Sequence, residues 1–280
     1  MEITKIQEIE EKAKQIRIEI VKQVYNARSG HPGGSLSIAD IMSVLYFNEM
    51  NIDEKNPNLE DRDRFVLSKG HCVAALYSAL ALRGYFSMED LSKFRKIDGN
   101  LQGHPDMTKV PGIDMSTGSL GQGISAAVGM AIAGKLDNKN YRVYTILGDG
   151  EIEEGQVWEA AMSANKYKLD NLCVIVDNNN LQIDGTIEEV IGLNKIEEKF
   201  KSFGFETFTI DGHNFEEIIR AFGKAKDTKG KPTCIIAKTV KGKGVSFMEN
   251  KVEWHGKAPN DEEFKQAIND VFWDGAKKHH

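Results

Sequence analysis

Two neighbouring segments hold residues of the types that bind a divalent cation and a diphosphate. Asp149 lies in Gly-Asp-Gly at the end of one apolar run, and a run of asparagines that includes Asn179 follows the next. Carboxylate and amide oxygens suit Mg²⁺, which normally takes substrate phosphate oxygens as remaining ligands. Gly150 permits close backbone approach, and the amides that open the following helix can face a diphosphate. The pair indicates a Mg²⁺–diphosphate site, although Gly-Asp-Gly alone is equally typical of a tight turn.

Short apolar runs predict the strands that position these residues. Three runs, 143–147, 172–176 and 233–237, are nearly continuous and β-branched, which is typical of parallel strands covered on both faces. Two weaker runs cover 64–67 and 205–210. Because ligands of such sheets bind beyond the carboxyl ends of the strands, we expect Asp149 and Asn179 to be neighbours in space.

Helical spacing of apolar residues predicts the elements that cover the sheet. It occurs at 6–24, 38–50, 73–82, 123–136 and 156–168. Asn214 and Glu217 have the spacing of a capping box at the start of a further helix. The predicted fold is α/β, with a doubly wound, mostly parallel sheet flanked by helices and an N-terminal helical section.

Composition narrows the class of protein. The 280 residues are 40% hydrophobic and 28% charged with a net charge of −6, which fits one large α/β domain. Lysine and arginine are scattered among acids, so nucleic acid is not an expected partner. No segment approaches the roughly 18 consecutive apolar residues of a membrane span, so we expect no membrane partner. Cys72, Cys173 and Cys234 are odd in number and lie in apolar surroundings, which indicates buried free thiols and a cytoplasmic location.

Several motifs in order carry a resemblance to a known family. The Asp149 to Asn179 pattern resembles the thiamine diphosphate signature. Further motifs are Ser29-Gly30-His31-Pro32-Gly33, 63–71 ending in Lys69-Gly70-His71, Gly103-His104-Pro105, 117–123 beginning Thr117-Gly118-Ser119-Leu120, and Trp254-His255-Gly256. Together they resemble the transketolase family from about His31 to His255.

This resemblance implies roles for residues around the cofactor. The implied Mg²⁺ ligands are Asp149, Asn179 and the backbone carbonyl of Leu181. Residues implied at the diphosphate or the cofactor rings are His71, Gly118, Leu120, Gly150, Asn179 and His255. The implied cofactors are therefore thiamine diphosphate and Mg²⁺.

It also implies residues that act on the sugar. His31, His104 and His255 match the histidines around the reacting carbons. An imidazole titrates near neutral pH and can either donate to a developing alkoxide or accept its proton. Glu154 matches a glutamate that meets the catalytic glutamate of the facing domain. For Glu154, as for Glu151 and Glu153, the alternative is an acid favoured at a helix N-terminus.

Some residues have simpler interpretations. A single histidine after glycine is as readily a loop residue, and His213 is expected to be a turn residue before a helix. The lysines of 238–244 are interpreted as a solvated loop. His279 and His280 are assigned no role.

The resemblance extends to only one of the family's domains. It implies that 1–280 is a single diphosphate-binding domain, and that the pyrimidine-binding and C-terminal domains, with their catalytic glutamate, lie on a separate chain. The chain would then be the N-terminal subunit of a split transketolase, with two copies of each subunit. It would transfer a two-carbon ketol unit from a ketose phosphate to an aldose phosphate.

Two alternatives stay open. One is the α subunit of a thiamine-dependent 2-oxo acid dehydrogenase, and the other is a noncatalytic thiamine diphosphate-binding module. Ser119 stands where many full-length transketolases have proline, and Gly34-Ser35 departs from their usual sequence. The sequence therefore leaves the preferred donor and acceptor sugars open.

Overall fold

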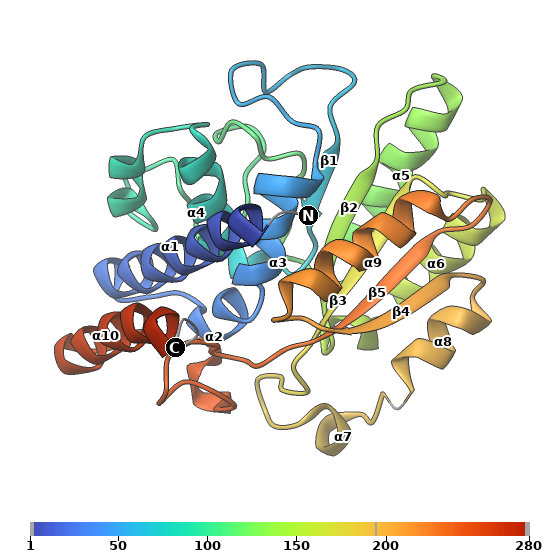
Figure 1. Ribbon diagram of the computed structural model, residues 1–280. Helices are drawn as coiled ribbons and strands as arrows, with labels where there is room; N and C mark the ends of the chain where they lie inside the picture. The colour runs from blue at the N-terminus through green and yellow to red at the C-terminus, as the bar shows by residue number, and fades with distance from the viewer. Residues whose placement is uncertain (1–2, 194, 278–280) are drawn as a thin grey trace.

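The chain folds around one parallel sheet, described here from a computed structural model that covers residues 3–193 and 195–277 (Figure 1). The strands are β1 Arg64–Leu67, β2 Val143–Gly148, β3 Leu172–Asn178, β4 Glu206–Asp211 and β5 Thr233–Lys238. They pair in the order β1-β2-β3-β5-β4, and every pair is parallel. All five predicted strands are present, and the α/β prediction is confirmed.

The two faces of the sheet are covered by different helices (Figure 1). Tyr144 and Ile146 pack into one apolar cluster with helices from the N-terminal section, whereas Val143 and Leu147 pack into the other. Alternate residues of a strand point to opposite faces, so β2 is buried on both sides. The edge strand β4 is less covered: Thr207 is buried, and the other residues of the strand are partly or fully exposed.

The helices follow the predicted periodicity closely. The first cluster is built by α1 Ile3–Ala27, α3 Ala39–Val44, α4 Val73–Arg83, α9 Phe215–Asp227 and α10 Asp261–Lys277. The second is built by α5 Gln122–Leu136, α6 Gly155–Lys166, α7 Ile187–Val190 and α8 Ile196–Ser202. Short helical segments also occur at α2 Pro32–Leu36 and at the 3-10 turns Gly70–Cys72, Met88–Lys93, Glu151–Glu153 and Val252–His255.

Two local expectations differ from the structure. The helix expected at 38–50 changes from α to π geometry at Leu45–Glu49. Asn214 caps α9 by accepting from the Glu217 amide at 3.1 Å, but the Glu217 carboxylate accepts from the Asp211 amide. The reciprocal half of the predicted capping box is therefore not formed.

His213 does more than occupy a turn. It lies in the turn before α9, as expected, but its Nδ1 is 2.7 Å from Asp40 Oδ2 and its Nε2 accepts from the Val240 amide at 2.9 Å. Arg17 also donates to Asp40 at 2.6 and 2.8 Å. The imidazole thus ties the turn to the N-terminal helices.

Other expectations concern burial and membrane association. Cys72, Cys173 and Cys234 are buried and free, as predicted. Within the described residues, no helix combines the length and the apolar character required to cross a bilayer. His279 and His280 lie outside the described residues.

Candidate functional site

A cavity of about 530 Å³ lies at the carboxyl ends of the strands and collects most of the predicted site residues. It receives Gly148 from β2 and Asp177 from β3. Its lining includes, from the predicted set, His31, His71, Gly118, Leu120, Asp149, Gly150, Glu154, Asn179, Leu181 and His255. Asp149 and Asn179, which are separated by α6 in the chain, meet here as predicted.

His104 lies at the rim of this cavity. It is exposed, and its ring centroid is 6.4 Å from that of His31. Gly118 makes this position possible, because a Cβ there would lie 3.0 Å from the His104 ring and its φ of +152° disfavours a side chain.

Asp149 is a buried carboxylate held by backbone amides. It is 2% exposed and accepts from the Gly150 amide at 2.9 Å and from the Asn180 amide. Burial, together with the nearby carboxylate of Asp177, raises the pKa of Asp149 to about 6. A bound cation would offset both effects, so this carboxyl group suits a metal ligand.

The other two predicted metal ligands follow the end of β3. The Asn179 side chain donates from Nδ2 to Asp177 at 3.0 Å and accepts at Oδ1 from the Leu181 amide at 3.1 Å. The Leu181 carbonyl accepts from Lys241 Nζ at 3.0 Å. Within residues 3–193 and 195–277, no group of three or more His, Cys, Asp or Glu side chains is arranged to hold a metal. A metal here would instead need amide and carbonyl oxygens beside Asp149, as Mg²⁺ accepts.

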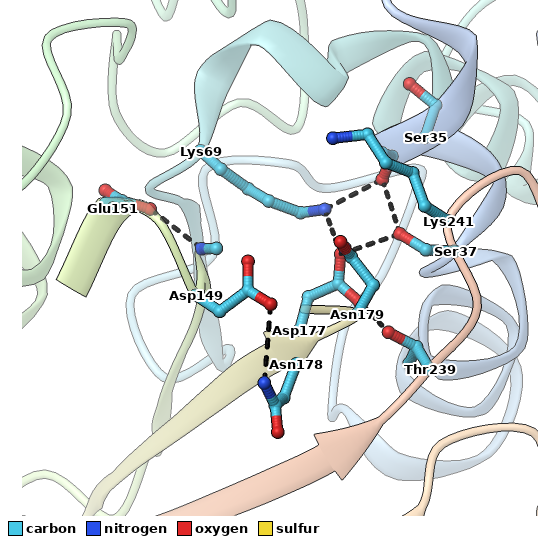
Figure 2. Close-up of polar contacts among 12 residues, drawn as sticks. Ser35, Ser37, Lys69, Asp149, Glu151, Asp177, Asn178, Asn179, Thr239 and Lys241 are labelled. Carbon is cyan, nitrogen blue, oxygen red and sulfur yellow. Dashed lines mark hydrogen bonds and ion pairs between the residues drawn. The ribbon is translucent and has the colours of Figure 1, made fainter. Parts of the chain in front are cut away.

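A buried ion pair lies beneath these ligands (Figure 2). Lys69 Nζ is 2.6 Å from Asp177 Oδ2 and also donates to the Gly34 carbonyl at 2.7 Å. Ser37 donates to the same carboxylate oxygen at 2.6 Å, and Thr239 donates to the other. Burial alone would raise the pKa of Asp177, but the Lys69 ammonium and these hydrogen bonds hold it below its usual range.

This network was not predicted from the sequence. Lys69 and Asp177 are 2% and 0% exposed at their side chains. Both residues fall inside quoted motifs, but the sequence gives no sign that they pair. Their effect is to fix the Asn179 amide through its Nδ2 hydrogen bond.

Four imidazole rings gather at the cavity, three of them in its lining and His104 beside it. His31 lies 5.2 Å from His71 and 5.5 Å from His255, and His71 lies 5.1 Å from His255, between ring centroids. Burial and neighbouring positive groups lower the pKa of His31 to about 4 and that of His255 to about 3. Burial also lowers the pKa of His71, and the pKa of His104 is lowered by the partial burial of its ring and by the charge of Arg95. The cluster is therefore neutral near pH 7.

Lys241 contradicts the interpretation of 238–244 as a solvated loop. It is 2% exposed, it lines the cavity, and its Nζ lies 3.0 Å from both the Leu181 carbonyl and His255 Nδ1. Backbone hydrogen bonds from Gly242 to Gly33 and from Asn250 to Lys241 fold the loop inward. Burial lowers the pKa of Lys241. Nothing in the local sequence distinguishes this lysine from its neighbours.

The three acidic residues after Gly150 have different surroundings. Glu151 is 2% exposed and accepts from Ser68, from the Gly121 amide at 3.0 Å and from the Gly148 amide at 3.1 Å. Burial raises its pKa. It therefore links the 117–123 loop to the Gly-Asp-Gly turn, which the sequence did not indicate.

Glu153 and Glu154 lie nearer the opening of the cavity. Glu153 accepts from Gln182 Nε2 at 3.0 and 3.2 Å. Glu154 is exposed and stands at the N-cap of α6 without a side-chain capping hydrogen bond. Glu154 therefore stands where a helix N-terminus favours an acid, as the alternative expected, and it also lines the cavity.

The fold and the cavity define an α/β protein that binds its ligand at the carboxyl edge of a parallel sheet. The family model for the thiamine diphosphate binding domain of transketolase matches residues 9–280. The chain belongs to the transketolase family and matches its thiamine diphosphate binding domain.

Individual relatives refine this placement. The chain is 46% identical to a 6-deoxy-6-sulfo-D-fructose transketolase subunit of Clostridium sp. strain MSTE9, over 96% of this chain and 98% of the relative. It is 43% identical to one of the subunits of the apulose-4-phosphate transketolase of Phocaeicola vulgatus, over 95% of this chain and 94% of the relative.

Longer relatives match over only part of their length. Human transketolase is 42% identical over 96% of this chain but 42% of its own length. The crystal structure of Campylobacter jejuni transketolase superposes with a TM-score of 0.91 at 38% identity, over 98% of this chain and 44% of that one. The chain thus spans nearly all of the subunit relatives and less than half of these longer transketolases. It corresponds to the N-terminal subunit of a split transketolase.

Proposed function

We propose that this chain forms one side of a transketolase active site and works with a separate C-terminal subunit. Together they would transfer a two-carbon ketol unit from a ketose phosphate to an aldose phosphate. The observation that carries this proposal is the meeting of the histidine cluster with Asp149 and Asn179 in one cavity. A cavity with an oxygen-ligand end and an imidazole end suits a diphosphate cofactor and a polyhydroxylated substrate.

The residues present fit Mg²⁺ and thiamine diphosphate. Asp149, Asn179 Oδ1 and the Leu181 carbonyl would hold Mg²⁺, supported by the raised pKa of the buried Asp149 carboxyl. The diphosphate would lie against Gly150 and the polar groups of His71, His255 and Lys241. Gly150 packs closely against Gln182, since an added Cβ would lie 3.1 Å from the Gln182 side chain. When bound, thiamine diphosphate supplies the carbanion chemistry that cleaves and forms the carbon–carbon bond.

Gly118 and Leu120 would lie beside the rings of the cofactor. Gly118 has no side chain to obstruct this part of the cavity, and Leu120 is 37% exposed although it is apolar. An exposed leucine at the cavity wall offers apolar contact to a bound ring.

The histidines would bind the sugar and manage its protons. His31, His104 and His255 are neutral near pH 7, so each can donate an N–H to a sugar oxygen or accept a proton from a hydroxyl. Lys241 adds a buried positive charge next to His255 that favours anionic ligands.

The partner chain would complete the site from the open side. Glu154 is exposed at the cavity and would meet the catalytic glutamate of the partner's pyrimidine-binding domain. Ile183 and Ile191, which also line the cavity, are 63% and 67% exposed and would be covered by that chain. We propose one diphosphate-binding domain over 1–280 and two copies of each subunit. The reduced cysteines support a cytoplasmic location.

The substrates named for the two subunit relatives differ, one being a sulfofructose and the other apulose 4-phosphate. We propose ketose phosphates as donors for this chain, with pentose phosphates as the first pair to assay. The histidine cluster disfavours the 2-oxo acid dehydrogenase alternative, because a 2-oxo acid has no hydroxyl chain to be bound by several imidazoles. It also disfavours a noncatalytic module, which has no need of sugar-binding residues.

Reconstitution tests this proposal. The purified chain is mixed with C-terminal subunits encoded by neighbouring genes, thiamine diphosphate, Mg²⁺ and pentose phosphates, and ketol transfer is measured. Activity should need both chains. Full activity of the isolated chain would contradict the split site, decarboxylation of 2-oxo acids would favour the first alternative, and failure with every partner would favour the noncatalytic module.

A further inference from the structure

Arg95 was assigned no role from the sequence. It contacts the segment that carries His31 and the segment that carries His104. Its Nη1 donates to Ser29 Oγ at 3.2 Å, and its Nη2 lies 3.5 Å from His31 Nδ1 and 3.4 Å from the Gly103 carbonyl. Gly103 permits this approach, because a Cβ there would lie 2.6 Å from Arg95 Cζ. One guanidinium therefore joins the His31 segment to the residue before His104.

The backbone of Arg95 is also unusual. Its φ of +56° is in the left-handed region, which residues with side chains rarely adopt and which is often found near functional sites. The amide of Arg95 donates to the Leu101 carbonyl at 2.8 Å, which holds this conformation. The chain thus maintains an unfavourable backbone geometry at the residue that reaches His31.

The chemistry of the contact favours one of the two ring nitrogens of His31 as the site of its proton. A guanidinium has only N–H donors, so the ring nitrogen that faces it must present a lone pair. His31 is neutral near pH 7, because burial and then the charge of Arg95 lower its pKa to about 4. In a neutral imidazole whose Nδ1 is an acceptor, the proton is on Nε2.

The Nε2 edge of His31 is available to a ligand. His31 lines the cavity, and its Nε2 has no hydrogen-bond partner among the described residues. Gly256, on the neighbouring loop, does not block it, because a Cβ added at Gly256 would still lie 4.0 Å from His31 Nε2. The N–H therefore has space in front of it.

We infer that Arg95 is a positioning residue that holds His31 as its Nε2–H tautomer, so that His31 donates a hydrogen bond to an oxygen of the bound sugar instead of acting as a base. The identity of that acceptor rests on the proposed function. The tautomer itself is a property of this chain. Lys241 makes the equivalent contact with His255 Nδ1 at 3.0 Å, and an ammonium also lacks an acceptor.

Nitrogen NMR of the chain labelled with ¹⁵N-histidine reads the tautomer directly. The unmodified chain should show His31 with its proton on Nε2, and Arg95→Lys should keep it there because lysine is also a pure donor. Arg95→Glu should move the proton to Nδ1, since a carboxylate accepts from it, and should raise the pKa of His31. A proton on Nδ1 in the unmodified chain, or no change in Arg95→Glu, would overturn the inference.

A milder variant covers the case in which Arg95→Glu does not fold. Arg95→Met removes the donor and the charge, so the Nδ1–H fraction and the pKa of His31 should both rise. Arg28→Met is the matched control, since Arg28 has a φ of +53° but is exposed and contacts Asp261 and Tyr25. The control should leave the His31 signals unchanged. A His31 shift of equal size in the control, or none in Arg95→Met, would contradict a specific role for Arg95.

Kinetics of the reconstituted two-chain enzyme distinguish positioning from general support of the fold. Arg95→Met should lower kcat/KM for the ketose about tenfold, the loss expected for one misdirected hydrogen bond, with cofactor affinity unchanged. A loss of cofactor affinity without a tautomer change would show a merely structural residue. If the reconstituted enzyme transfers no ketol unit, the proposed function fails, whereas the NMR result still decides the role of Arg95.

Discussion

The two ends of the cavity are built in different ways. At the metal end, Asp149 and Asn179 follow adjacent strands and are held by backbone amides and by the Lys69–Asp177 pair. At the histidine end, the rings lie on loops and short turns and are held by the side chains of Arg95 and Lys241. The first end is fixed by the sheet, whereas the second is fixed by side chains that reach in from other segments.

Substitutions at the two ends should therefore have different effects. Changes at the metal end should affect cofactor binding and stability, because its residues are part of the buried framework. Changes at His31 and His104 should affect turnover, whereas changes at His71, His255 or Lys241 should affect cofactor binding as well, because these three would contact the diphosphate. A variant that crosses this division would contradict the account.

The largest effect is expected at Asp149. Asp149→Ala should abolish Mg²⁺-dependent binding of thiamine diphosphate, which calorimetry measures. Asp149→Asn is the matched variant, since it keeps the size and an acceptor but removes the charge, and it should weaken binding by more than about 100-fold. Unchanged affinity in both variants, with the fold intact by circular dichroism, would refute the metal assignment.

Breaking the buried ion pair should be the next largest effect. Lys69→Met leaves the buried Asp177 carboxylate without its positive partner, so the free energy of unfolding should fall by about 3–5 kcal/mol in denaturant titrations. Lys93→Met provides the control, because the Lys93–Asp90 pair is exposed at both side chains and should contribute only about 0–1 kcal/mol. Equal losses in the two variants would show that the metal end is not held by this pair.

The next prediction concerns His104, at the histidine end of the cavity. Its ring lies at the rim and makes no hydrogen bond to the described residues, so His104→Ala should leave cofactor affinity unchanged. Turnover of the reconstituted enzyme should fall about 100-fold, as when a proton-transfer group is lost. Reduced cofactor affinity with normal turnover would place His104 at the wrong end of the cavity.

The smallest effect concerns the pH dependence of stability. His31 has a pKa of about 4 in the folded chain and about 6.5 when unfolded, so acidification between these values protonates only the unfolded state. This contribution to the free energy of unfolding is full above about pH 6.5 and is lost as the pH falls towards 4. Chemical denaturation of His31→Asn should show a weaker fall over that window. An equal fall in both proteins would mean that His31 is not neutral in the folded chain.

The sequence predicted the strands and the meeting of Asp149 with Asn179 for a physical reason. Apolar periodicity reports burial, and parallel strands bring their carboxyl ends to one edge, so Asp149 and Asn179 had to meet. The buried roles of Lys241 and Glu151 were not predictable in this way. Both depend on loops that fold inward through backbone contacts with distant segments, and a lysine or glutamate has no local signal for such burial.

Arg95 shows the same limit at the histidine end. Its contacts with Ser29, His31 and Gly103 join segments far apart in the chain or across a loop. The histidines themselves were found through the motif resemblance, and their pKa values are lowered first by burial and then by the positive groups around them. The residue types therefore indicated which groups act on the ligand, whereas the tertiary structure sets the protonation state of the histidines.

The central claim is that this chain holds the metal and histidine ends while another chain completes the site. A titration tests it most directly: the C-terminal subunit is added stepwise to a fixed amount of this chain, with saturating thiamine diphosphate and Mg²⁺, and the rate of ketol transfer is measured. The account predicts no transfer by either chain alone and a rate that saturates at one partner per chain. Full activity of this chain without any partner would contradict it.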